Sequence, residues 1–148
     1  MIKEVKSAFK MALAAALTYL IVGQLHLNFP FYAVIGSIIV LSETGTLTLK
    51  LGFQRAIGTV IGAFSGAFFV LALGSNLWAI LFSVFFTTLL AYFIYKDGVK
   101  LGGYISAIVI ISHSQFPLSY AWDRCIETFV GIGVALFVSN LIFPIQID

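Results

Sequence analysis

The chain has 148 residues, of which 61% are hydrophobic and only 9% are charged, and its mean hydropathy is +1.09. A water-soluble domain of this size carries roughly a quarter charged residues, so the composition excludes one. The net charge of +2 offers no extended basic surface for nucleic acid, and a single cysteine, Cys125, excludes an internal disulfide or a cysteine metal cluster. We expect one membrane domain, residues 1–148.

Six apolar segments follow one another along the chain, and the connections between them are short. Four segments reach the roughly 20 apolar residues that a membrane-spanning helix needs. Their approximate bounds are residues 8–25, 52–73, 77–95 and 120–143. The other two segments are shorter, near residues 30–41 and 101–112, and the longest connection lies near residues 43–50. Long unbroken apolar runs exclude the alternating strands of a barrel, so we predict an all-α integral membrane protein with six transmembrane segments.

A motif at the start of the third segment recurs 69 residues later at the start of the sixth. The first copy reads Arg55-x-x-Gly58-Thr59-x-x-Gly62-x-x-x-Gly66, and the second reads Arg124-x-x-Glu127-Thr128-x-x-Gly131-x-x-x-Ala135. The recurrence predicts two related halves of three segments each, repeat 1 at about residues 8–73 and repeat 2 at about 77–143. Because three is odd, the second half crosses the bilayer in the opposite direction, and inverted repeats are typical of transporters.

The positive charges predict how the chain is oriented in the membrane. Seven of the eight Lys and Arg residues fall on the side that holds both termini, namely Lys3, Lys6, Lys10, Lys50, Arg55, Lys96 and Lys100. The positive-inside rule then places both termini in the cytoplasm, in an inner or plasma membrane. The exception is Arg124, and the inverted repeat explains it, because Arg124 is the counterpart of Arg55.

Small residues line one face of the third segment and one face of the sixth. Gly58, Gly62 and Gly66 are four residues apart and therefore lie on one helix face, and Gly131 and Ala135 form the matching face of the sixth segment. Membrane helices pack closely through such faces. We therefore favour helix packing over substrate contact as the function of these residues.

Charged side chains within the apolar segments are the strongest candidates for function, because each costs several kcal/mol near the bilayer centre. Arg55, Arg124 and Glu127 are such residues. Arg124 and Glu127 lie three residues apart on one helix, a spacing that suits a structural ion pair. In the alternative interpretation the arginines attract an anion while Glu127 tunes them, and the two roles are compatible. Tyr32 and Tyr104, near the starts of the short segments, are further candidates for lining an anion pathway.

Four motifs together resemble the aromatic acid exporter and fusaric acid resistance superfamily, to which the plant aluminium-activated malate transporters are related. Two are the arginine motifs that begin at Arg55 and Arg124, and the others are Pro30-x-Tyr32-Ala33 and Asn140-x-x-x-Pro144. The resemblance covers essentially the whole chain. It implies a six-helix unit that transports organic anions as a homodimer. It also implies that Arg55, Arg124, Glu127 and Tyr32 are motif positions. Many members of the superfamily carry a large cytoplasmic domain or a second membrane half, whereas this sequence stops four residues after Pro144.

The leading hypothesis is therefore export of organic anions, with aromatic carboxylates as the expected substrates, by a transporter or a channel. A homodimer is expected because six helices, two of them short, leave little room for a pathway inside one copy, and Ala8, Ala12 and Ala16 offer an interface on the first segment. The alternative is a membrane scaffold or assembly subunit that transports nothing. No catalytic constellation, cofactor or metal site is expected, and the identity of the substrate stays open.

Overall fold

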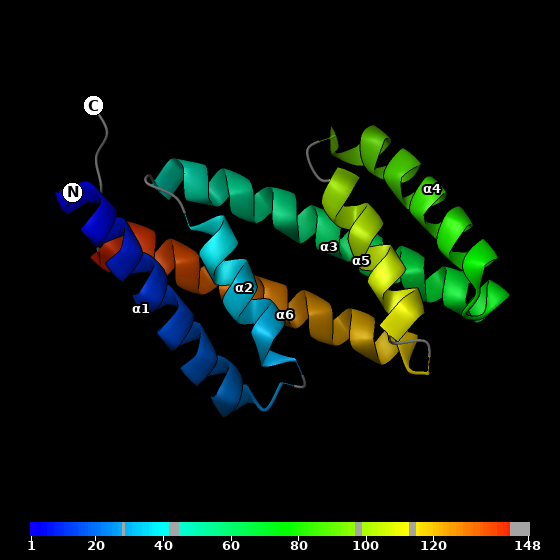
Figure 1. The fold of residues 1–148 in the computed structure, drawn as a ribbon, viewed down its shortest axis with the longest axis horizontal. Coiled ribbons are helices and arrows are strands. Elements are labelled where there is room, and N and C mark those ends of the chain that lie inside the picture. Colours follow the sequence, from blue (N-terminus) through cyan, green and yellow to red (C-terminus); the bar gives the residue numbers. More distant parts are fainter. Residues whose placement is uncertain (28, 42–44, 97–98, 113–114, 143–148) are drawn as a thin grey trace. The chain divides into compact units, whose positions relative to one another are not determined.

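The computed structural model describes residues 1–27, 29–41, 45–96, 99–112 and 115–142, and every regular element formed there is a helix (Figure 1). In chain order the α-helices are α1 (Ile2–Leu25), α2 (Pro30–Val40), α3 (Gly45–Leu73), α4 (Leu77–Ile94), α5 (Val99–Ser112) and α6 (Pro117–Phe137). A π-helix, η2 (Val138–Ile142), continues α6. The prediction of an all-α chain with six helical segments is confirmed.

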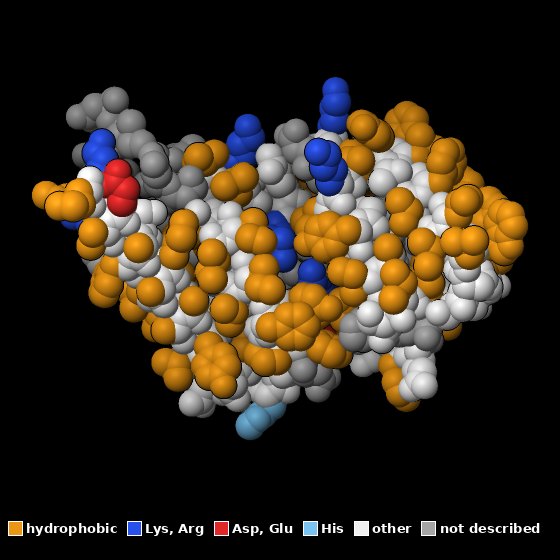
Figure 2. Space-filling view, viewed as in Figure 1, with side chains coloured by type: hydrophobic (Ala, Val, Ile, Leu, Met, Phe, Trp, Pro, Cys, Tyr) orange, Lys and Arg blue, Asp and Glu red, His pale blue; other side chains and the backbone are white. Residues whose placement is uncertain are grey.

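Three of these helices are long and apolar enough to cross a membrane: α1, residues Leu47–Leu73 of α3, and α4. Helices α2 and α5 are apolar but shorter. Helix α6 has 21 residues, but its first half contains three charged residues, Asp123, Arg124 and Glu127. Hydrophobic side chains cover most of the face seen in Figure 2, with few charged side chains among them. The chain is a multi-pass helical membrane protein.

The chain divides into two compact units, each of which contains part of α3 and part of α6. The first unit consists of Met1–Phe53 and Ile126–Asp148. In it α1 packs against α2 and against η2. The core of this unit is a cluster of buried apolar side chains from four helices, namely Ala14, Val40, Leu41, Val134, Ala135 and Val138, with Leu17, Leu51 and Ile132 packed around it.

The second unit consists of Gln54–Cys125, and in it α4 packs against α5. Its core contains Ala63, Ile105 and Ala121 from three helices, with Phe64 and Leu101 packed around them. The ring of Trp122 on α6 meets the ring of Phe64 on α3 edge to face, with centroids 5.8 Å apart. Each core contains two alanines, namely Ala14 and Ala135 in the first unit and Ala63 and Ala121 in the second, and such small side chains let helix backbones approach closely.

Two of the helices are followed by residues with positive φ. Helix α1 ends at Leu25, and its cap residue His26 adopts the left-handed conformation with φ 54°. Gly74, with φ 78°, makes the turn between α3 and α4, where the absence of a side chain permits a positive φ. Asn76 then caps α4, because its side-chain oxygen accepts a hydrogen bond from the Ala79 N–H at 2.9 Å.

Several predicted boundaries were wrong. The predicted connection near 43–50 is helical from Gly45 onwards, so α3 starts about two turns before the predicted segment, and α1 starts at Ile2. Both extensions are rich in polar residues, so the apolar pattern misses them, although backbone hydrogen bonding continues through them. The sixth segment also begins earlier, at Pro117, and its α-helix ends at Phe137. The last part of the predicted sixth segment, residue 143, lies outside the described residues, as does Pro144 of its motif.

Buried positions recur along the chain at the spacing of the arginine motif. The buried residues of α1 are Lys10, Ala14, Thr18 and Val22. Those of α4 are Ala79, Ser83, Thr87 and Ala91, each 69 residues later. The buried residues of α2, Ala33, Gly36, Ser37 and Val40, correspond in the same way to Gly102, Ile105, Ser106 and Val109 of α5. Corresponding helices therefore bury corresponding faces in the two units.

Candidate functional site

Both arginines of the repeated motif are buried, although arginine is among the residue types that are least often buried. Arg55 on α3 and Arg124 on α6 belong to the unit Gln54–Cys125, and Arg124 is only 2% exposed. Among the described residues, the Nε atom of Arg55 is buried without a hydrogen-bond partner. A guanidinium has five N–H donors and cannot lose its charge, so such a group favours an anion close to it.

The fully buried carboxylate of Glu127 caps another helix in its unit. Its Oε1 atom accepts a hydrogen bond of 2.8 Å from the backbone N–H of Phe29, the N-cap residue of α2. The next residue, Pro30, has no N–H to satisfy. A carboxylate at this position also faces the positive end of the helix dipole. Glu127 therefore holds the start of α2, an interaction that the sequence analysis missed.

The boundary between the two units falls between Arg124 and Glu127, so the predicted ion pair between them stays a prediction. Tyr32 lies near Glu127, because the Tyr32 N–H donates to the Phe29 carbonyl and the two rings are 5.9 Å apart. Tyr104 is 43% exposed on α5. The structure thus places Tyr32 and Glu127 at the same end of α2, while Arg55, Arg124 and Tyr104 belong to the other unit.

The glycines of the motif lie against backbone atoms of a neighbouring helix. A Cβ atom added to Gly62 would be 2.5 Å from the carbonyl oxygen of Gly102 on α5. One added to Gly131 would be 2.7 Å from the carbonyl oxygen of Ala33 on α2. A Cβ atom added to Gly66 would be 2.8 Å from the carbonyl oxygen of Ser106 on α5. Ala135 is part of the core of its unit, and Gly58 is buried. Gly62, Gly66 and Gly131 therefore leave no room for a side chain.

A second group of buried polar side chains was missed by the sequence analysis. Lys10 on α1, Thr48 on α3 and Ser139 in η2 are all buried in the first unit. The Thr48 hydroxyl donates to the Ser139 hydroxyl at 3.4 Å, within the part of the chain where the α-helix gives way to a π-helix. Lys10 was expected at the membrane surface with Lys3 and Lys6, which are indeed exposed. Nothing in the sequence around Lys10, Thr48 and Ser139 indicates that these polar residues are buried.

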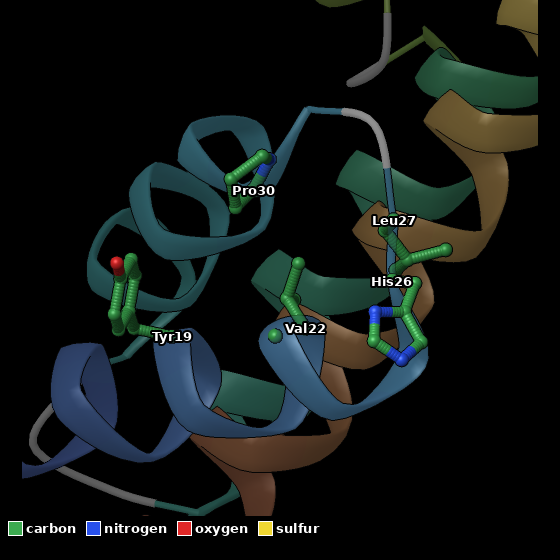
Figure 3. A pocket seen from close by; sticks show the side chains of 6 residues that line it. Tyr19, Val22, His26, Leu27 and Pro30 are labelled. Carbon is green, nitrogen blue, oxygen red and sulfur yellow. The ribbon is translucent and has the colours of Figure 1, made fainter.

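An open cavity of about 390 Å³ lies where α1 gives way to α2 (Figure 3). It is lined by Tyr19, Val22, Gly23, His26, Leu27 and Pro30, all within the first unit. Figure 3 shows Tyr19 at one side of the opening and His26 with Leu27 at the other. Nothing in the sequence around His26 predicts a cavity beside it.

Comparison with known proteins places the sequence among membrane proteins of one family. A profile described as fusaric acid resistance protein-like matches residues 13–138, from the middle of α1 to the start of η2. Similar proteins include the UPF0421 proteins of Staphylococcus saprophyticus and Staphylococcus haemolyticus, each 26% identical over 141 residues. The alignments cover 91% of this chain but only 42% and 41% of those proteins. The chain thus spans about two fifths of the length of these relatives.

Proposed function

We propose that this chain, which belongs to the fusaric acid resistance protein-like family, moves organic anions across a membrane, with aromatic carboxylates as the main substrates. The observation that carries the proposal is the burial of Arg55 and Arg124 in a chain whose surface is mostly apolar. Placing a guanidinium at membrane depth is costly, and charges kept there usually belong to solute pathways. The family description refers to resistance to an acid, and export of the acid is one way in which a membrane protein confers resistance.

The proposed architecture is a pair of inverted repeats, with repeat 1 at about residues 8–73 and repeat 2 at about 77–143. The matching buried faces of α1 and α4, and of α2 and α5, support it. So do equivalent polar contacts, because the Ser37 hydroxyl donates to the Val34 carbonyl and, 69 residues later, the Ser106 hydroxyl donates to the Gly103 carbonyl, each at 2.8 Å. Arg55 and Arg124 would then lie near opposite faces of the membrane, where each attracts anions to one mouth of the pathway.

The proposed orientation has both termini in the cytoplasm. It is supported by the exposed lysines, which flank the start of α1, the first part of α3 and the connection between α4 and α5, namely Lys3, Lys6, Lys50, Lys96 and Lys100. If each helix crosses the membrane, all five lie on one side, and the positive-inside rule assigns that side to the cytoplasm.

A homodimer is the proposed assembly. Ala8, Ala12 and Ala16 are exposed on α1 and lie four residues apart, so they form a flat stripe against which the same helix of a second copy fits. A two-fold axis along the membrane normal would let both copies enclose a pathway. Native mass spectrometry in mild detergent should give twice the mass of one chain, and a monomer at all concentrations would contradict the proposal.

Flux into proteoliposomes tests the function directly. Vesicles that contain the protein should take up radiolabelled benzoate faster than empty vesicles, and Arg124→Gln should reduce this rate while Lys6→Gln, an exposed lysine, should not. Benzoate uptake equal to that of empty vesicles would contradict transport. If the protein also co-purified with a larger membrane complex, the result would favour the alternative of a scaffold subunit.

A further inference from the structure

We infer that the cavity between α1 and α2 is a binding site for an aromatic carboxylate, with Tyr19 and His26 as its polar contacts. The inference rests on the proposed function for its substrate class and adds a site that the arginine motif does not include. The volume of the cavity, about 390 Å³, is within the range of small-molecule sites, roughly 300–1,000 Å³. All six residues that line it belong to one compact unit.

The cavity lies at the end of α1, and two of its lining residues, His26 and Leu27, form the cap of that helix. The Leu27 N–H donates to the Val22 carbonyl and the His26 N–H donates to the Gly23 carbonyl, so the helix closes in a Schellman motif with His26 in the left-handed position. Glycine usually occupies this position, since a side chain there is strained. His26 therefore stands at a position that favours glycine, and backbone strain of this kind is often found at functional sites.

Gly23 also lines the cavity. Apart from its chain neighbours and the backbone of its own helix, no atom lies within 4 Å of the point where its Cβ would be, so a side chain can be added there without a clash. The corresponding position in the second half of the chain, 69 residues later, is Tyr92. A cavity is therefore not a necessary result of the helix arrangement, because the matching helix places a large side chain at the same position.

The lining suits a ligand with a ring and a charge. Val22, Leu27 and Pro30 provide apolar surface, and the Tyr19 ring adds an aromatic face. The imidazole of His26 and the hydroxyl of Tyr19 can each donate a hydrogen bond, and both residues are exposed, so that a carboxylate bound there would keep part of its hydration. Glu127 indirectly fixes one wall, because its bond to the Phe29 N–H holds the start of α2 beside Pro30.

Calorimetric titration of the purified full chain with benzoate tests the site, with benzyl alcohol as a neutral ligand of similar shape. Gly23→Leu should abolish benzoate binding by filling the cavity. Gly133→Leu is the matched control, since Gly133 is also a helical glycine with no atom within 4 Å, and it should bind like the wild type. His26→Gly should weaken benzoate binding about ten-fold through loss of a hydrogen bond to a charged group. The same change should raise the unfolding temperature, because glycine suits the left-handed position. A residue with only a structural role would not give these opposite effects.

Equal benzoate binding by Gly23→Leu and Gly133→Leu would overturn the inference. So would equal affinities for benzyl alcohol and benzoate, which would make the cavity an apolar surface filled by lipid tails. Flux separates this inference from the proposed function. Normal benzoate transport by Gly23→Leu would remove the site and leave transport intact. The converse result is a wild type that binds benzoate without transporting it and a Gly23→Leu variant that loses this binding. That result would leave the site intact and remove transport.

Discussion

The close helix packing at Gly62 and at Gly131 gives a sharp prediction about stability. An added Cβ at Gly62 would be 2.5 Å from the Gly102 oxygen and 3.0 Å from the Gly102 Cα atom, and one at Gly131 would be 2.7 Å from the Ala33 oxygen. Non-bonded heavy atoms reach their best separation at about 3.5–4.0 Å. The helices would therefore have to move apart by roughly 1 Å, since backbone atoms cannot rotate away as a side chain does.

Overpacking of this kind costs about 1–3 kcal/mol. Alanine also has a higher helix propensity than glycine by about 1 kcal/mol, and this gain must be separated from the clash. Gly133→Ala provides the control, because Gly133 lies on the same helix as Gly131 and has no atom within 4 Å of its Cβ position. Gly62→Ala and Gly131→Ala should thus be less stable than Gly133→Ala by about 1–3 kcal/mol.

The single cysteine supplies the assay. Cys125 is buried, so a thiol-reactive fluorophore should label it only when the protein unfolds on heating in detergent. At about 2–4 °C per kcal/mol for a chain of this size, the midpoints of Gly62→Ala and Gly131→Ala should lie about 2–12 °C below that of Gly133→Ala. Equal midpoints for all three variants would refute the close contacts of α3 with α5 and of α6 with α2.

Three further changes have defined outcomes. Glu127→Leu should lower the free energy of unfolding by about 1.5–3 kcal/mol, because the Phe29 N–H loses a charged acceptor. Glu127→Gln should lower it less, since glutamine keeps an oxygen that can accept the bond. Equal thermal midpoints for the wild type and both variants would show that the bond contributes nothing. Arg124→Gln should reduce benzoate flux about ten-fold or more. Arg124→Lys should retain part of the flux, because the charge remains but the guanidinium fork does not. Unchanged flux in a normally folded Arg124→Gln variant would remove Arg124 from the pathway. Asn76→Ala should cost about 1 kcal/mol through loss of the α4 cap and leave flux per folded protein unchanged, measured by the same two assays.

Local sequence was sufficient for the helical class and for the number of helices, because apolar runs and small-residue spacing are short-range signals. Local sequence did not predict contacts between residues that are far apart in the chain. Glu127 binds a backbone N–H 98 residues away, and nothing near Glu127 or Phe29 in the sequence indicates that contact. The ion pair with Arg124 was the natural prediction from spacing alone, since residues three apart on a helix are neighbours.

Helix bounds failed for a different reason. The first turns of α3 contain Thr46, Thr48 and Lys50, whose polarity indicates a connection, yet the helix requires only that backbone groups bond to one another. The π-helix after Phe137 has no sequence signature that distinguishes it from α-helix. The cavity depends on an absent side chain at Gly23 and on the left-handed backbone of His26, and histidine is not the residue that predicts such a conformation.

On the proposed repeat, the two halves agree in packing residues and differ in charged ones. Gly62 and Gly131 contact backbone in corresponding places, and both arginines are buried. Glu127, however, corresponds to Gly58, and His26 corresponds to Tyr95. A transporter with identical halves would present the same chemistry at both mouths, so its two directions would be equivalent. In the proposed transporter, the differences at these positions would make the two mouths unequal, while the shared packing would keep the fold common to both halves. The determinants of direction and substrate should therefore be sought where the repeat is broken, and Gly58→Glu, which copies one such difference into the first half, is the variant that would test this.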